Sequence, residues 1–146
     1  MADAATSIII ADTKYHHVIH LTSISDGTGE AAVVKVDKTV GAAMLAAVGG
    51  AEAVALDLEQ IDWNIQGMTY VVLLWDHTTD DRMILLNGNG YKDFRGVGQA
   101  VTGLIQTNGL KDPVTTGGTG DVLLTTVGAV ATATYDITLW LKKRPA

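Results

Sequence analysis

Strict alternation of apolar and polar residues constrains this chain more than any other feature. Near the C-terminus, one apolar set alternates with a second, mostly polar set: Tyr135, Ile137, Leu139 and Leu141 against Thr134, Asp136, Thr138, Trp140 and Lys142. A period of two is that of a β-strand with one buried face, because successive side chains point to opposite faces of a sheet. The segment is therefore predicted to be a half-buried strand, the last strand of the fold.

A second alternating run changes phase part of the way along. Apolar residues occupy the even positions from 54 to 58 and the odd positions from 61 to 65. Because a one-residue slip moves every later side chain to the other face, a phase change marks a β-bulge or a strand that crosses from one sheet to another. The sequence predicts one of these two features within this run.

The remaining strands are predicted from apolar runs bounded by turns. Residues 69–76 and 82–88 are continuously apolar and fit strands covered on both faces, or a central strand plus a subunit contact. Further strands are predicted at residues 6–11, 15–22, 31–36 and 121–127, with glycine-containing turns between them. About eight strands at this spacing are typical of a sandwich or small barrel. We predict an all-β fold, with residues 1–146 forming a single antiparallel, jelly-roll-like β-sandwich domain.

One alanine-rich segment departs from the strand pattern. Residues 42–48 are followed by Gly49 and preceded by Gly41. A glycine just past the last apolar residue is a common end of a helix. The segment is predicted to be either a short helix or a flexible loop.

Composition and charge exclude several classes of protein. A length of 146 residues suits one domain, and 47% hydrophobic residues suffice for a core. The net charge of −6 predicts repulsion of nucleic acid and of anionic membranes, so neither is an expected partner. The chain has no cysteine, hence no disulfide and no thiolate nucleophile or metal ligand. Lacking a signal peptide and a long apolar stretch, it is expected to be soluble where it is made. The basic residues 142–144 are predicted to be a solubilising tail.

Three histidines lie close together in the sequence HHVIH. On a strand, His16 and His20 point to one face and His17 to the other. A four-residue separation on a strand is about 13 Å, which is too far for two side chains to share one ion. We therefore predict no metal site here within one subunit, whereas a site on a symmetry axis stays open.

The loop DHTTDD carries a concentration of acidic residues. Asp76, Asp80 and Asp81 could offer oxygen ligands to Ca²⁺. The loop lacks the alternating D-x-D-x-D-G order that lets a short loop wrap an ion, and Asp and Thr commonly cap turns through their side-chain oxygens. We predict turns and no metal or cofactor. Residues 75–94 are predicted to be a hairpin in which Trp75 and Phe94 contribute to the core.

No catalytic motif is recognisable. The glycine-rich stretches NGNGY and GGTGD are followed by no Lys-Ser/Thr pair, so both are predicted to be tight turns rather than phosphate sites. No serine stands in a G-x-S-x-G elbow, and the acidic pairs have no apolar surroundings that would raise a pKa. We predict no catalytic residues and no enzyme activity.

Three stretches of the sequence carry a resemblance to a known family. They are YVVLLWDHTTDDRMILLNGNGYKDF, GLKDPVTTGGTGDVLLTTVGAV and TYDITLWLKKR, within residues 54–144. As a set they resemble a group of small virion proteins of tailed bacteriophages. The resemblance implies a non-enzymatic structural component of the particle, one that decorates or cements the capsid on the head surface after synthesis in the host cytoplasm. A neck, tail or fibre-base component is the first alternative, and a sugar- or metal-binding β-sandwich is the second.

The resemblance also implies partners, namely further copies of the chain and the major capsid protein. We expect a closed homo-oligomer, with a trimer favoured by the decoration role. Residues 1–13 are predicted to be either an N-terminal arm that pairs with a neighbour or the first strand of the chain's own sandwich. The candidate partner contacts are Ile8, Ile9, Ile10, His16, His20 and Trp140.

Overall fold

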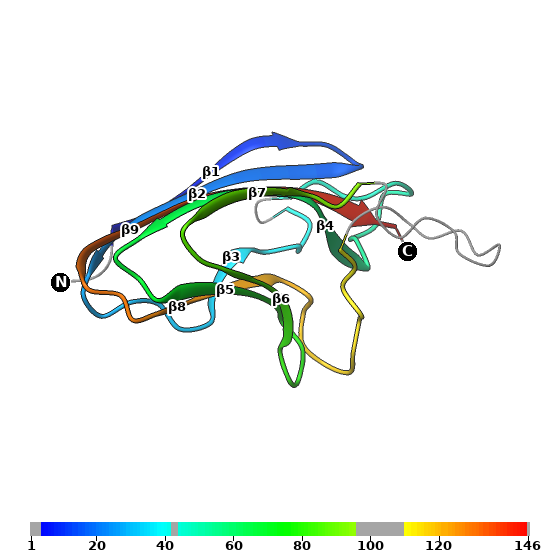
Figure 1. Ribbon diagram of the computed structural model, residues 1–146. Helices are drawn as coiled ribbons and strands as arrows, with labels where there is room; N and C mark the ends of the chain where they lie inside the picture. The colour runs from blue at the N-terminus through cyan, green and yellow to red at the C-terminus, as the bar shows by residue number, and fades with distance from the viewer. Residues whose placement is uncertain (1–3, 42–43, 96–109, 146) are drawn as a thin grey trace, which may run out of the picture.

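Two antiparallel β-sheets pack face to face in the computed structural model, which describes residues 4–41, 44–95 and 110–145 (Figure 1). The strands in these ranges are β1 (Ala4–Asp12), β2 (His16–Asp26), β3 (Val33–Val36), β4 (Ala55–Gln66), β5 (Tyr70–Trp75), β6 (Asp81–Leu86), β7 (Asn89–Asp93), β8 (Val122–Val127) and β9 (Ala131–Arg144). One sheet has the order β1-β2-β9-β4-β7 and the other has the order β3-β8-β5-β6. The predicted all-β antiparallel sandwich is confirmed.

Strands β2 to β9 follow the order of a jelly roll. The four strands β2-β9-β4-β7 face the four strands β3-β8-β5-β6. Of the connections between β2 and β9, only the β5–β6 turn stays within one sheet, and every other connection crosses to the opposite sheet. The ninth strand, β1, is added outside this arrangement, at the free side of β2.

The core lies between the sheets and comes from the alternating residues. The inward residues of β9, among them Ile137, Leu139 and Leu141, are fully buried, as the alternation predicts. Trp75 is buried, and its indole Nε1 donates to the Leu56 carbonyl at 2.9 Å. Phe94 is partly buried and packs against the same core. The expected contribution of both aromatic residues to the core is therefore confirmed.

The phase change in β4 is a β-bulge. β4 pairs with β9 along its whole length, and the register shifts between Leu58 and Gln60. Glu59 is the extra residue, after which Ile61 and Ile65 face the core in place of the even positions. The strand stays in one sheet throughout, so the bulge, and not the sheet crossing, is the correct alternative.

Residues 75–94 do not form one hairpin, and NGNGY is not only a tight turn. β5 and β6 form a hairpin in one sheet, but the chain then turns at Gly88 and enters the other sheet as β7, which pairs with β4. Gly90 lies within β7. Glycine is required at this position because a Cβ atom there would come 2.6 Å from the Trp63 ring. The glycine therefore marks close packing under an aromatic ring, and among the described strands β7 is the one beyond the eight predicted.

No helix forms in the described part of the predicted 42–48 segment, and residues 42 and 43 lie outside the described residues. Both backbone polar groups of Leu45 are bound by side chains, because its N–H donates to Asp12 Oδ2 at 2.7 Å and its carbonyl accepts from Lys143 Nζ at 2.8 Å. Met44 and Ala47 are buried in the core. For residues 44–48 the helix alternative is wrong, since these contacts hold the backbone as a loop against the sheet.

β1 is an outer edge strand. It pairs with β2 from Ala4↔Ile24 to Asp12↔His17, with a bulge between Ile9 and Ala11. No described strand pairs with its other side. Residues 4–11 are all exposed, so β1 belongs to the sheet while contributing little to the core.

Candidate functional site

Three segments meet at one end of the sandwich, beside the turn that joins β5 to β6. They are the turn at residues 76–80, Asp81 at the start of β6, and residues 110–120 before β8. In Figure 1 the β5–β6 turn and the yellow to orange segment before β8 lie at the same end of the molecule. Backbone hydrogen bonds join them, from Thr78 N–H to the Thr116 carbonyl at 3.1 Å and from Gly120 N–H to the Asp76 carbonyl at 2.8 Å.

His77 is the centre of this region. Its side chain is 4% exposed, and Nε2 lies 2.8 Å from Asp112 Oδ1 and 3.8 Å from Asp81 Oδ2. On the other side of the ring, Nδ1 lies 3.0 Å from the Gly117 carbonyl oxygen. The imidazole therefore connects residues that are 35 and 40 positions away in the sequence.

Both ring nitrogens of His77 face hydrogen-bond acceptors. A carbonyl oxygen can only accept, and an ionised carboxylate can only accept, so both nitrogens donate when the ring is an imidazolium. Burial lowers the pKa of His77, but the hydrogen bonds to Gly117 and Asp112 and the negative charges of Asp112 and Asp81 outweigh it. The net pKa is raised above its usual value. The raised pKa widens the pH range in which both ring nitrogens donate.

Hydrogen bonds of its backbone N–H and carbonyl groups hold Asp112 in place. Its N–H donates to Asp57 Oδ1 at 3.1 Å, and its carbonyl accepts from Arg144 Nη2 at 3.0 Å. Its side chain is 0% exposed. Oδ1 accepts from Val114 N–H at 2.8 Å in addition to facing His77, whereas Oδ2 has no hydrogen-bond partner among the described residues. A buried carboxylate fixed this firmly presents its oxygens in one orientation.

The three aspartates considered for Ca²⁺ do not gather around one point. Asp76 Oδ2 accepts from Thr119 Oγ1 at 2.7 Å, and Asp80 Oδ1 accepts from the His77 N–H at 3.3 Å. Both carboxylates thus have the turn-stabilising role expected of Asp in loops. Of the three, only Asp81 joins the cluster with His77 and Asp112.

Asp112 was missed as a candidate because sequence gave no reason to relate it to the acidic loop. It stands in the stretch LKDP, far from His77 along the chain. The available signal was the glycine pair that follows it. Gly118 has φ of +69°, and a Cβ there would collide with the Asp76 carbonyl oxygen and with His77 Cα. Glycine at this position marks a close backbone approach between the two loops.

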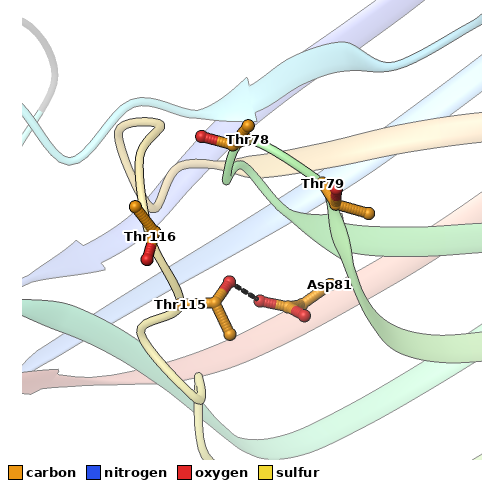
Figure 2. Close-up of a pocket in the computed structure, with 5 residues that line it drawn as sticks. All are labelled: Thr78, Thr79, Asp81, Thr115 and Thr116. Atoms are coloured by element: carbon orange, nitrogen blue, oxygen red, sulfur yellow. Dashed lines mark hydrogen bonds between the residues drawn. The ribbon is translucent and has the colours of Figure 1, made fainter.

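A pocket of about 350 Å³ opens beside the cluster. Figure 2 shows the residues that line it, four threonines and one aspartate: Thr78, Thr79, Thr115, Thr116 and Asp81. Thr115 Oγ1 donates to Asp81 Oδ2 at 2.6 Å, the contact drawn as a dashed line. Asp81 thus faces both the pocket and His77, and connects the cluster to the surface.

The β2 histidines lie on the faces that the alternation predicts. His16 and His20 point away from the core, with side chains 50% and 32% exposed, whereas His17 is buried. His16 Nε2 lies 2.8 Å from Glu59 Oε1, and His20 Nε2 lies 2.5 Å from Asp136 Oδ1. Each outward histidine therefore has its own carboxylate, which lies on the adjacent β9 for His20 and on β4, one strand further along the sheet, for His16.

The basic residues 142–144 are not a solubilising tail. They lie in β9, and the Lys143 side chain is 0% exposed. Arg144 pairs with Asp57 through Nη2. The prediction fails because position 143 continues the inward alternation of Leu139 and Leu141, which places a lysine in the interior.

The other candidate contacts lie on two surfaces. Ile8, Ile9 and Ile10 are 55%, 42% and 60% exposed on β1. Trp140 is half-buried on the outer face of its sheet, between the inward residues of β9. None of these residues borders the His77 cluster.

The fold and the cluster define a jelly-roll β-sandwich with a histidine–carboxylate group at one end. Comparison of the chain with protein-family models, curated proteins and solved structures finds no match. In the part of the chain that the structure describes, there is no helix with the length and apolar character needed to cross a membrane.

Proposed function

We propose that this protein is a non-enzymatic structural component of a tailed-phage virion that decorates the capsid surface. The sequence resemblance within residues 54–144 supports a virion role. The jelly-roll order of the strands supports it as an analogy, because viral capsid domains often have this architecture and fold alone does not determine function. The proposal depends most on one observation, the open apolar edge of β1.

The β1 edge has the properties of a docking strand. Natural edge strands are commonly protected by lysine, proline, inward charges or bulges. β1 (AATSIIIAD) contains neither lysine nor proline, has one bulge, and exposes Ile8, Ile9 and Ile10 next to its unpaired side. Main-chain pairing of a neighbour's strand, with burial of these side chains, is a known mode of recognition. We infer that β1 contacts a neighbouring subunit or the capsid.

A closed oligomer fits this edge best. Identical copies that bury an apolar surface against one another form rings when the rotation between them closes. The decoration role favours a trimer, with the major capsid protein as the second partner. A neck, tail or fibre-base position is the alternative, and it would use the same edge in a smaller number of copies.

The copy number per particle tests the proposal. Quantitative mass spectrometry of purified phage particles that encode this chain should find it in hundreds of copies. A few tens of copies or fewer would instead place it in the neck or tail. Absence of the chain from the particles would overturn the virion role altogether.

Variants of the edge test the role of β1. Ile8→Lys combined with Ile10→Lys should leave a folded chain that no longer assembles and no longer binds capsids that lack the protein. Val130→Lys is the matched control, because Val130 is 58% exposed and lies away from β1 in the turn before β9. Equal capsid binding by both variants, measured by co-sedimentation, would exclude β1 as the contact.

A further inference from the structure

We propose that His77, Asp81 and Asp112 form a binding site for a divalent transition-metal ion, with Zn²⁺ as its best match. This site is independent of the proposed virion role. One ligand atom from each residue lies within 4.8 Å of the other two. An imidazole nitrogen with carboxylate oxygens suits Zn²⁺, whereas Ca²⁺ and Mg²⁺ prefer oxygen ligands. The proposal departs from the expectation that the acidic loop holds no ion.

The spacing of the ligand atoms matches a tetrahedral ion. Bonds of about 2.1 Å at tetrahedral angles place two ligand atoms about 3.4 Å apart. His77 Nε2 lies 2.8 Å from Asp112 Oδ1 and 3.8 Å from Asp81 Oδ2, so the two separations bracket this value. The third pair, Asp81 and Asp112, is within 4.8 Å, so the side chains would have to move closer to the ion for all three atoms to bind it.

A second observation, apart from the spacing, concerns the carboxylate of Asp112. Its side chain is 0% exposed, and Oδ1 faces His77, whereas the second oxygen, Oδ2, has no hydrogen-bond partner among the described residues. A buried carboxylate oxygen without a partner is costly, and native structures rarely contain one without a reason such as a bound ion. A cation bound by both oxygens of this carboxylate would satisfy Oδ2.

The surroundings of the three residues are those of metal ligands. Histidine ligands usually donate their second ring N–H to a carbonyl or carboxylate, and His77 Nδ1 lies 3.0 Å from the Gly117 carbonyl. That bond directs Nε2 at the two carboxylates. Ligating carboxylates are themselves hydrogen-bonded, as Asp81 is by Thr115 Oγ1.

The charge of the cluster also favours a dication. The two carboxylates of the cluster carry two negative charges, which a divalent ion bound beside a neutral imidazole would balance.

The pocket gives the ion an entry path and a free coordination position. It is lined by Asp81 and four threonines, and it opens to solvent at the surface of the two loops. Water in the pocket can complete the coordination shell, with threonine hydroxyls as hydrogen-bond partners. The bound ion would then tie the 76–81 loop to the segment before β8.

Calorimetric titration of chelator-treated protein with ZnCl₂ tests the site. We expect one Zn²⁺ per chain and a higher melting temperature with the ion. Co²⁺ should bind at the same site with visible absorption of a four-coordinate ion, and Ca²⁺ should not compete. Failure to bind Zn²⁺ at micromolar concentration, or displacement of Zn²⁺ by Ca²⁺, would overturn the proposal.

Ligand variants assign the site. Asp112→Asn and Asp81→Asn should each weaken Zn²⁺ binding by more than about 100-fold, since even outer-shell changes cost about 10–100-fold. Asp81 is the safer variant, because its side chain is 27% exposed and its loss should leave the fold intact. Asp76→Asn in the same loop and His20→Asn on β2 are the matched controls, expected to bind like the wild type. Wild-type affinity in Asp81→Asn, or lost affinity in His20→Asn, would place the ion elsewhere and refute the assignment.

Discussion

Lys143 and Asp12, 131 residues apart, form a partly buried ion pair that fastens the end of β1 to β9. Nζ donates to Asp12 Oδ1 at 2.6 Å, and also to the carbonyls of Thr13 and Leu45 at 2.6 and 2.8 Å. All three donors of the ammonium group are therefore used. One lysine holds together the β1–β2 turn, the last strand and the loop around Leu45.

Lys143→Met should be strongly destabilising. It leaves the Asp12 carboxylate without its cation and removes the donor to two carbonyls, and breaking a buried pair by removing one partner costs about 3–5 kcal/mol. Lys142→Met is the matched control, since Lys142 alternates to the outer face and a change there should stay within about 0.5 kcal/mol. Urea unfolding of the two variants measures the difference, and similar midpoints would contradict this account.

Gly118→Ala should disrupt the two loops of the candidate site. A Cβ there collides with the Asp76 carbonyl oxygen and His77 Cα, in addition to the strain of φ at +69°. Gly49→Ala is the matched control, with φ of +99° and no atom within 4 Å of the added Cβ. We expect Gly49→Ala to lower the free energy of unfolding by about 1–2 kcal/mol through the strain alone, and Gly118→Ala to lower it by more. Equal melting temperatures of the two variants would show that the two loops can move apart without loss of stability.

His77 should make metal-free protein less stable as the pH rises. Its pKa is raised in the folded state, so folding binds a proton between the ordinary value of 6.5 and the folded value. The contribution is complete below pH 6.5 and is lost as the pH rises through the folded pKa. His77→Asn should therefore cost about 1–3 kcal/mol at pH 6 and less at pH 9, by urea unfolding in EDTA. A cost that does not change with pH would show that the pKa of His77 is the same in the folded and unfolded states.

His17 should make the protein less stable as the pH falls, which is the opposite of the pH dependence expected for His77. Burial lowers its pKa from 6.5, and the Asp12 carboxylate, 3.2 Å from Nδ1 without hydrogen-bond geometry, offsets this only in part. The unfolded chain then binds the extra proton, so stability is complete above pH 6.5 and falls as the pH drops through the folded pKa. His17→Phe should flatten the pH dependence between pH 5 and 6.5 in thermal melts. If the melting temperature of His17→Phe depends on pH as steeply as that of the wild type, another group causes this pH dependence.

All described strands except β7 could be predicted from sequence because each has a local signature. The alternation in β9 and the phase change in β4 depend only on neighbouring residues, and both predicted the structure, the second as the bulge at Glu59. β7 was missed because Gly90 suggested a turn, whereas the Trp63 ring that requires a glycine there is distant in sequence. The helix alternative was wrong for residues 44–48 for a similar reason, since Asp12 and Lys143 hold Leu45 from outside the segment.

The candidate site could be predicted only in part. His77 and Asp81 stand in one loop whose chemistry attracts attention, but Asp112 comes from a segment that only the fold brings beside them. Lys143 was also misjudged, because a basic C-terminal triplet suggests a solvated tail. The alternation that places Leu141 in the core places Lys143 there as well, with an acid and two carbonyls that no local pattern predicts.

Deleting residues 1–11 should leave the sandwich folded. Residues 4–11 are all exposed, and the deletion keeps Asp12 and therefore its pair with Lys143. The lost β1–β2 hydrogen bonds are replaced by bonds from β2 to water, so we expect a loss of about 1–3 kcal/mol. Near-UV circular dichroism and thermal melting measure the outcome, and an insoluble product or a lost tertiary signal would show that β1 is needed for folding.

Ile19→Ala provides the comparison from within the core. Ile19 is 3% exposed on β2, directly opposite Ile9 of β1, and its truncation should cost about 2–5 kcal/mol. We therefore expect one truncated side chain in the core to cost more stability than the removal of eleven residues from the edge. The binding assay should give the reverse order, with Ile19→Ala attaching to particles below its melting temperature and the deletion variant failing to attach. If the deletion variant binds as well as the wild type, β1 is a covering strand only and the contact with the particle lies on another face.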